Sequence, residues 1–311
     1  MLQVLDTIAA TRAAIAESRA RGSIGFVPTM GALHAGHASL IQRARSECGT
    51  VIVSVFVNPL QFDRPDDLER YPRSLETDLE LCRKESVDLV FAPTVSEMYP
   101  RPMEMAVDVG RLADHLCGRY RPGHFKGVAT VVLKLLEIVR PDVAYFGEKD
   151  AQQLAVVRRL VTDFNVPVRI AGVPTVREPD GLALSSRNLR LSGDERQLAP
   201  CLYAALRRAA LSVEKGVSNV SEITRDAATA IPADERLRLE YLELVDPEDF
   251  QPVTRVTAPL VAAGALWVGN TRLIDNVRCT PPLQNGPPDR LRQGYGGPPK
   301  RSAKAEGGHD I

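Results

Sequence analysis

A strand, a glycine-containing turn and the start of a helix follow one another at residues 24–42, and this feature constrains the fold more than any other. An apolar run from Ile24 to Val27 precedes the turn, and a helical pattern follows it. Such a turn in an α/β protein binds phosphate, because free backbone N–H groups and the helix dipole attract anions. His34 and His37 lie across the turn three residues apart, so both fall on one face of the first helical turn. Their ring nitrogens could therefore reach phosphate oxygens that the backbone already holds.

The turn does not match the two common nucleotide-binding loops. It lacks G-x-x-x-x-G-K-[ST], and Gly31 and Gly36 do not form G-x-G-x-x-G. Residues 34–37 instead fit the His-x-Gly-His signature of nucleotidylyl-transferring α/β folds. Taken alone, this tetrapeptide is equally typical of a metal-binding pair or of surface histidines on an ordinary βα turn.

Short β-rich runs alternate with helical patterns up to about residue 175, which predicts βαβ units and a parallel sheet. The predicted strands cover 24–28, 50–57, 87–91, 104–109, 143–146 and 168–173, and the predicted helices cover 3–20, 75–86, 127–139 and 150–163. Ligands of such sheets bind at the carboxyl ends of the strands. His34, Asn58 and Lys149 each closely follow a predicted strand, so we expect them to lie together.

The alternation changes after residue 176. Helices are predicted over 192–215, where Ser192 and Glu195 form a capping box, and over 220–231; short strands are predicted over 238–245, 254–257 and 265–269. We therefore predict an α/β fold, in which residues 1–175 form a Rossmann-like parallel sheet with helices on both faces. Residues 176–281 are predicted to form a smaller α+β domain that closes over the site. The Gly- and Pro-rich residues 282–311 are predicted to be a disordered tail.

Charge and cysteine content narrow the class of protein. Lys and Arg number 39, as do Asp and Glu, so there is none of the basic excess typical of nucleic-acid-binding proteins. Five cysteines are scattered without C-x-x-C spacing, which is typical of reduced thiols in the cytosol. No leader pattern and no run of 18 apolar residues is present. We expect a cytoplasmic protein that binds neither nucleic acid nor membrane.

Four further segments, in this order and spacing, carry a resemblance to a known family. They are Val-Ser-Val-Phe-Val-Asn-Pro-Leu-Gln-Phe at 53–62, Phe-Gly-Glu-Lys-Asp-Ala-Gln-Gln at 146–153, Leu-Ser-Ser-Arg-Asn at 184–188 and Thr-Arg-Leu-Ile-Asp-Asn at 271–276. Together with the histidine turn, they resemble the pantothenate synthetase (pantoate–β-alanine ligase) family over roughly residues 1–280. The resemblance implies a homodimeric, AMP-forming ligase that joins pantoate to β-alanine through a pantoyl adenylate. Its partners would be ATP, pantoate and β-alanine.

The resemblance also implies which residues bind ATP. His37, His34, Lys149 and Arg187 would be the catalytic groups, with His37 the family's usual proton donor, although a purely electrostatic role fits a leaving pyrophosphate better. The wider ATP-binding set would be Met30, Gly31, Ala32, Leu33, His34, Ala35, Gly36, His37, Gly147, Glu148, Lys149, Asp150, Val176, Leu184, Ser185, Ser186 and Arg187. Simpler roles stay open for several of these: His37 could be a capping or core residue, Asp150 a helix cap and Arg187 a solvated loop residue.

The pantoate and β-alanine site would comprise Gln61, Gln153, Asn58, Val128 and Val131. Neutral amides pair with hydroxyls and carboxylate without adding charge, and the two valines would either contact the gem-dimethyl group or belong to the ordinary core. Gln152 is the candidate surface glutamine beside Gln153. ATP implies Mg²⁺, for which Asp78 is a candidate ligand. The polar residues 63–73 form a loop that would either close over the adenylate or be a mobile surface loop.

Two other functions share part of this pattern. A nucleotidylyltransferase acting on another acid would share the histidine turn but not Gln61 and Gln153. A catalytically silent relative could bind nucleotide or pantoate as a sensor, although the full set of polar residues argues against silence.

Overall fold

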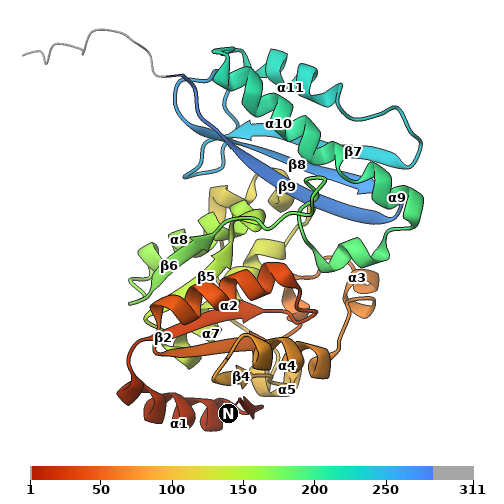
Figure 1. The fold of residues 1–311 in the computed structure, drawn as a ribbon. Helices are drawn as coiled ribbons and strands as arrows, with labels where there is room; N and C mark the ends of the chain where they lie inside the picture. Colours follow the sequence, from red (N-terminus) through yellow and green to blue (C-terminus); the bar gives the residue numbers. More distant parts are fainter. Residues whose placement is uncertain (1, 283–311) are drawn as a thin grey trace, which may run out of the picture.

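The computed structural model describes residues 2–282, so the predicted tail lies almost entirely outside the described residues. The chain forms a six-stranded parallel sheet and a three-stranded antiparallel sheet (Figure 1). This confirms the predicted fold class: a parallel sheet with helices on both faces, followed by a smaller α+β part.

The parallel sheet has the strand order β1-β4-β3-β2-β5-β6. Its strands are β1 (Gln3–Leu5), β2 (Ile24–Thr29), β3 (Thr50–Val55), β4 (Leu89–Phe91), β5 (Val143–Gly147) and β6 (Arg169–Val173). Its helices are α1 (Ile8–Ser18), α2 (Ala35–Glu47), α3 (Pro65–Glu69), α4 (Leu75–Lys84), α5 (Val95–Met98), α6 (Leu116–Tyr120), α7 (His124–Val139) and α8 (Ala151–Asp163). From β2 the chain builds outward through β3 to β4, and it then returns to place β5 on the other side of β2. Ligands of open α/β sheets bind where the strand order reverses, which is here the end of β2 and β5.

Alternate side chains of the strands enter two different cores. Phe26 and Ile52 pack against α1, α7 and α8, whereas Val27, Val51 and Val53 pack against α2 and α4. Side chains of successive residues point to opposite faces of a strand, so near-continuous apolar runs are what a sheet covered on both faces requires.

The second part stacks helices on a short antiparallel sheet. Strands β7 (Leu237–Val245), β8 (Leu260–Val268) and β9 (Thr271–Cys279) are covered on one face by α9 (Gly193–Leu198), α10 (Cys201–Glu214) and α11 (Val220–Ala228) (Figure 1). The opposite face packs on α6, α7 and α8 through Tyr241, Val261 and Ala265. This sheet thereby lies directly above the carboxyl end of the parallel sheet.

Several element predictions were wrong in the first part. Residues 3–5 form β1 beside β4 instead of extending the first helix, which begins after the Thr7 cap. Residues 104–109 form no strand, because the Val107 N–H donates to the Thr130 hydroxyl of α7 rather than to a neighbouring strand.

The second part also differs from its prediction. The helix predicted over 192–215 is divided at Ala199–Pro200, where proline lacks the N–H that a continuous helix needs, although its Ser192–Glu195 capping box is confirmed. Residues 254–257 contribute only an isolated bridge at Arg255, β8 begins at Leu260 rather than 265, and β9 was not predicted.

Candidate active site

The turn after β2 is held by one buried carboxylate. Asp78 of α4 accepts hydrogen bonds from the backbone N–H groups of Ala32 (3.1 Å) and Leu33 (2.7 Å). Gly31 has φ +79°, and a Cβ there would lie 2.8 Å from the Asp78 carboxylate, so glycine is required. Burial raises the pKa of Asp78, and the two backbone hydrogen bonds oppose this rise. Both carboxylate oxygens therefore stabilise the turn, and Asp78 does not line the cavity described below; its role as a metal ligand stays a prediction.

The two histidines cap the helix that follows. His34 Nδ1 accepts from the Gly36 N–H at 3.1 Å, and His37 Nδ1 accepts from the His34 N–H at 3.2 Å, which together form a capping box. Because each Nδ1 is an acceptor, the neutral ring carries its proton on Nε2. Neither Nε2 has a hydrogen-bond partner among residues 2–282, and both rings line a cavity at the end of β2 and β5. Capping and ligand binding are therefore compatible in these residues.

The histidines are neutral at neutral pH. Burial lowers the pKa of His34 to about 4, with a further contribution from Lys149 that Asp150 opposes. Burial lowers the pKa of His37 to about 3, and His34 and Lys149 add to the effect. Each ring therefore offers an N–H donor without carrying a positive charge, and a proton-donor role for free His37 does not fit this pKa.

The end of β5 contributes one of the cations of the site. Lys149 follows this strand in a short 3-10 turn, and its ammonium lies 3.9 Å from the Asp150 carboxylate. The Asn276 amide of β9 donates to the carbonyl oxygens of Glu148 (2.9 Å) and Lys149 (2.8 Å). The smaller sheet thus fixes the backbone that carries the lysine. Asn276 belongs to a segment that carried the resemblance, but its role was missed because the strand containing it was not predicted.

The second polar turn of the site comes from residues 184–187. Ser185 caps the 3-10 helix Ser186–Arg190, and Arg187 donates to the Asp67 carboxylate of α3 at 2.9 Å, while Arg190 lies 3.1 Å from the same carboxylate. Burial would raise the pKa of Asp67, but these two arginines lower it below its usual value. The 63–73 loop is therefore tied to the second part of the chain through Arg187.

Neutral amides form the other side of the cavity. The Gln61 Nε2 lies 2.9 Å from the Met30 sulfur, and its Oε1 accepts from Asn58 at 3.1 Å. The amide of Asn58 also contacts Gly127, Leu60 and Tyr99, so Asn58 supports Gln61 and has no amide atom left for a substrate. A Cβ at Gly127 would lie 2.1 Å from the Leu60 carbonyl oxygen, so only glycine allows α7 to approach this turn so closely.

The two adjacent glutamines of α8 differ in role. Gln152 is buried, and its side chain contacts the backbone of Cys117, Leu112 and His115 at 2.8–3.0 Å. The expectation that Gln152 is a surface residue was therefore wrong. Gln153 lines the cavity, and no protein hydrogen-bond partner of its amide is found among the described residues.

These groups enclose a cavity of about 220 Å³. The predicted residues that line it are Met30, His34, Gly36, His37, Asn58, Gln61, Val128, Val131, Gly147, Lys149, Asp150, Gln153, Val176, Leu184, Ser185, Ser186 and Arg187. Gly31, Ala32, Leu33, Ala35 and Glu148 do not line it, because they shape the two turns instead. Val128 and Val131 also belong to the core around α7, so their place in the core is compatible with a position on the cavity wall.

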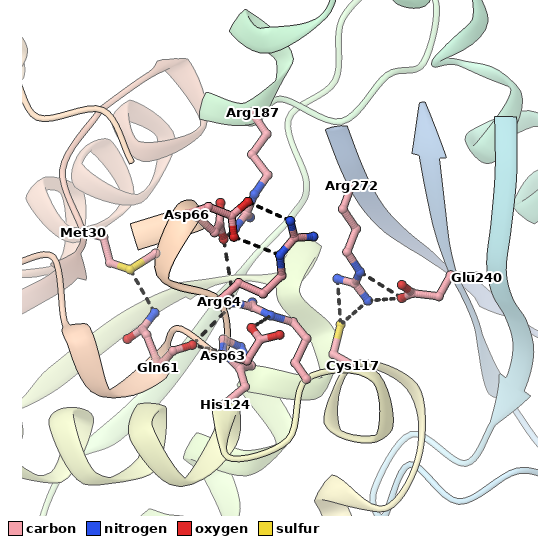
Figure 2. Close-up of polar contacts among 12 residues, drawn as sticks. Met30, Gln61, Asp63, Arg64, Asp66, Cys117, His124, Arg187, Glu240 and Arg272 are labelled. Carbon is pink, nitrogen blue, oxygen red and sulfur yellow. Dashed lines mark hydrogen bonds and ion pairs between the residues drawn. The ribbon is translucent and has the colours of Figure 1, made fainter. Parts of the chain in front are cut away.

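His124 and Arg121 were missed by the sequence analysis. His124 Nδ1 lies 2.8 Å from the Gln61 carbonyl oxygen, and Arg121 bonds Asp63 at 2.8 Å (Figure 2). Both line an adjoining cavity between the two parts of the chain. Their position just before α7, opposite the Gln61 turn, carries no local sequence signal.

Three comparisons with known proteins agree. A family model described as pantoate-beta-alanine ligase matches residues 3–278. A bifunctional pantoate ligase/cytidylate kinase of Thermosynechococcus vestitus is 52% identical over 275 residues, which are 88% of this chain and 54% of that protein. This chain spans about half the length of such bifunctional relatives.

Two solved structures have the same fold. A pantothenate synthetase from Thermus thermophilus is 49% identical with a TM-score of 0.84, and the match covers 88% of this chain and 98% of that chain. A pantoate-beta-alanine ligase from Francisella tularensis, complexed with beta-gamma ATP and beta-alanine, is 37% identical with a TM-score of 0.75, covering 89% and 97%.

Proposed function

This chain belongs to the pantoate–β-alanine ligase family, and on that premise we propose that it condenses pantoate with β-alanine to pantothenate at the expense of ATP. The observation that carries the proposal is one cavity, at the reversal of the strand order, that joins phosphate-binding turns to a neutral amide cluster and an apolar wall. These are the surfaces that a triphosphate and a small branched hydroxy acid require.

The reaction needs an activated carboxyl group. The pantoate carboxylate attacks the α-phosphorus of ATP, pyrophosphate leaves and a pantoyl adenylate forms. The β-alanine amine then attacks the acyl carbon, and AMP leaves. Positioning and electrostatic stabilisation provide most of the catalysis in such displacements.

We assign the ATP contacts to both turns. His34 and His37 donate Nε2–H to phosphate oxygens as neutral groups, and Lys149 supplies a point charge for the phosphates. Arg187 supplies a planar pair of donors once Asp67 releases it. Because neither histidine needs to lose a proton, their role is to hold the phosphates in line rather than to transfer protons.

We assign pantoate to Gln61 and Gln153. The Gln61 amide is positioned by Asn58 and Met30, and Gln153 approaches from α8. Val128 and Val131 provide an apolar surface for the two methyl groups. The amides select hydroxyl and carboxylate oxygens without competing with the triphosphate for cations.

The residues of the cavity fit a Mg²⁺ ion that arrives on the triphosphate. Within the described part of the chain, no group of three or more His, Cys, Asp or Glu side chains could hold a metal ion, and Asp150 is the only acidic residue that lines the cavity. Mg²⁺ typically keeps several waters and takes few protein ligands beside nucleotide phosphates. It would neutralise phosphate charge, and Asp150 would be the acidic residue available to hold it.

Other expectations stay predictions: the homodimer, the cytoplasmic location, and the domain boundary at residues 175–176. Within residues 2–282, no helix has both the length and the apolar character needed to span a membrane.

The test measures AMP and pyrophosphate with ATP and pantoate, with and without β-alanine. We expect enzyme-bound adenylate and stoichiometric pyrophosphate without β-alanine, and continuous turnover to pantothenate and AMP with it. A nucleotidylyltransferase acting on another acid would release no pyrophosphate in response to pantoate. A silent relative would bind ATP or pantoate but would release no pyrophosphate.

A further inference from the structure

A strongly basic groove lies beside the cavity, and of the residues assigned above only Arg187 lines it. It has a volume of about 570 Å³, and it is lined by seven arginines but only four acidic residues. We call it the arginine groove. Its walls are the 63–73 loop and residues of the small sheet, together with the end of α6 and the turn that carries Arg187. Figure 2 shows Arg64 and Asp66 of the loop and Arg272 and Glu240 of the sheet.

The arginine groove is continuous with the ATP cavity through a single side chain. Arg187 lines both the cavity and the groove. Arg190, one turn further along the same 3-10 helix, lines only the groove and is exposed. A chain of guanidinium groups therefore leads from the place assigned to the phosphates toward solvent.

Asp67 marks where an anion binds within this chain. Its two carboxylate oxygens face Arg187 at 2.9 Å and Arg190 at 3.1 Å, and Arg121 lies 3.9 Å away. Three guanidinium groups around one carboxylate form the arrangement that suits a phosphate group with more oxygens and more charge. A polyanion could replace Asp67 here and gain contacts that the carboxylate does not use.

The outer part of the groove contains arginines that pair with no carboxylate of the described residues. Arg238 stacks 5.1 Å from the Trp267 ring, and Arg70 lies on the loop opposite; within residues 2–282 neither makes an ion pair. Arg64 also approaches Trp267, at 5.8 Å, so this ring is already occupied by cations. Tyr120 also lines the groove, where its ring stacks on Tyr241 at 5.6 Å and lies 5.9 Å from the Arg119 guanidinium. The charged groups thus outnumber the two aromatic rings, and each ring already has a cation beside it, which favours an inorganic anion over a nucleotide.

We propose that the arginine groove is a binding site for inorganic pyrophosphate, occupied as the anion leaves the ATP cavity. The identity of the ligand rests on the proposed function, because adenylate formation is the reaction that produces pyrophosphate at Arg187. The anion would pass from Arg187 to Arg190 and Arg238, and Asp67 would return to Arg187 behind it.

The test titrates sodium pyrophosphate into the full-length protein by calorimetry, with the ATP cavity filled by α,β-methylene ATP. We expect one binding event in the wild type. Arg190→Gln combined with Arg238→Gln should weaken it at least tenfold, while Arg83→Gln, which changes an exposed arginine of α4 that pairs with Glu76, should not. Binding should weaken steeply with added salt. Melting temperatures of the variants establish that they are folded.

Three results would overturn the proposal: no pyrophosphate binding when the cavity is filled, unchanged affinity in the double variant, or equally tight binding of sulfate. Adenylate formation measured on the same preparations separates this proposal from the proposed function. A protein that binds pyrophosphate but forms no adenylate would refute the function, whereas turnover without outer binding would refute only the arginine groove.

Discussion

The two polar turns that face each other across the cavity are held in different ways. The histidine turn is fixed from within the first part of the chain, by Asp78 and by its own capping box. The Ser185–Arg187 turn also has an internal cap from Ser185, but its Arg187 side chain is held from the first part of the chain by an ion pair with Asp67. Hydrogen bonds to a buried carboxylate are costly to break, whereas a partly exposed ion pair is exchanged for another anion at little cost. We infer that the first turn is preorganised for phosphate and that the second must exchange partners to bind it.

The largest effect should come from breaking the preorganised turn. His37→Ala removes one oriented donor, so we expect pyrophosphate release with ATP and pantoate to slow by roughly 10²–10³-fold. His37→Asn is the matched control, because its short side chain can still cap the helix but cannot present an N–H at the Nε2 position. If His37→Asn recovers most of the rate, capping rather than phosphate binding is the role of this histidine.

Gln153→Ala tests whether the amide side of the cavity binds pantoate rather than ATP. An unpaired buried hydrogen-bonding partner costs roughly 1–3 kcal/mol, so the KM for pantoate should rise by about one to two orders of magnitude. The KM for ATP should change only a few-fold. Gln152→Ala is the neighbouring control: it should lower the melting temperature and leave the KM for pantoate nearly unchanged. The reverse pattern would mean that the wrong face of α8 has been assigned to the substrate.

Asp67→Asn tests the exchange of partners at the second turn. Removing the competing charge should free Arg187 for phosphate, and a partly exposed ion pair contributes about 0.2–1 kcal/mol, so the KM for ATP should fall by roughly 1.4- to fivefold. Asp66→Asn, which removes the exposed partner of Arg64, is the control and should leave it unchanged. A higher KM for ATP in Asp67→Asn would show that the carboxylate assists nucleotide binding.

The last effect concerns the pH dependence of stability rather than catalysis, and it should arise from the first part of the chain. Burial lowers the pKa of His34 and His124 to about 4 and of His37 to about 3. Below about pH 6.5 the unfolded chain binds protons that the folded chain does not, so the free energy of unfolding should fall between pH 6.5 and 4. Denaturant unfolding at pH 7 and pH 5 measures this difference. His124→Gln should make it smaller; an unchanged difference would assign the loss of stability to other groups.

Periodicity predicted most of the parallel sheet, because its strands are short apolar runs buried on both faces. It missed β9, because Arg272, Asp275 and Asn276 interrupt the pattern of apolar residues that indicates a strand. Those residues are polar because of tertiary contacts: Asp275 pairs with Arg177 at 2.5 Å within the second part of the chain, and Asn276 donates to the backbone of Lys149 in the first part. A tertiary contact of this kind leaves no local periodicity.

For the site residues, too, the sequence predicted some features and missed others that depend on tertiary contacts. The resemblance identified which segments meet at the cavity, and the structure brings most of them there. It did not separate the ligand-facing residues from those that support them. Asp78 and Asn58 are polar residues near phosphate- and substrate-binding turns, yet their atoms are used by the backbone and by neighbouring amides. Only the positions of their partners distinguish support from ligand contact.

The contact of Asn276 with two consecutive carbonyl groups has a consequence for cooperativity. Since one side chain of β9 orders the backbone of Glu148 and Lys149, any opening that separates the small sheet from the parallel sheet also releases the lysine. Nucleotide affinity and the docking of the small sheet are then thermodynamically linked. ATP should slow amide hydrogen exchange in β9, a strand none of whose residues it needs to touch.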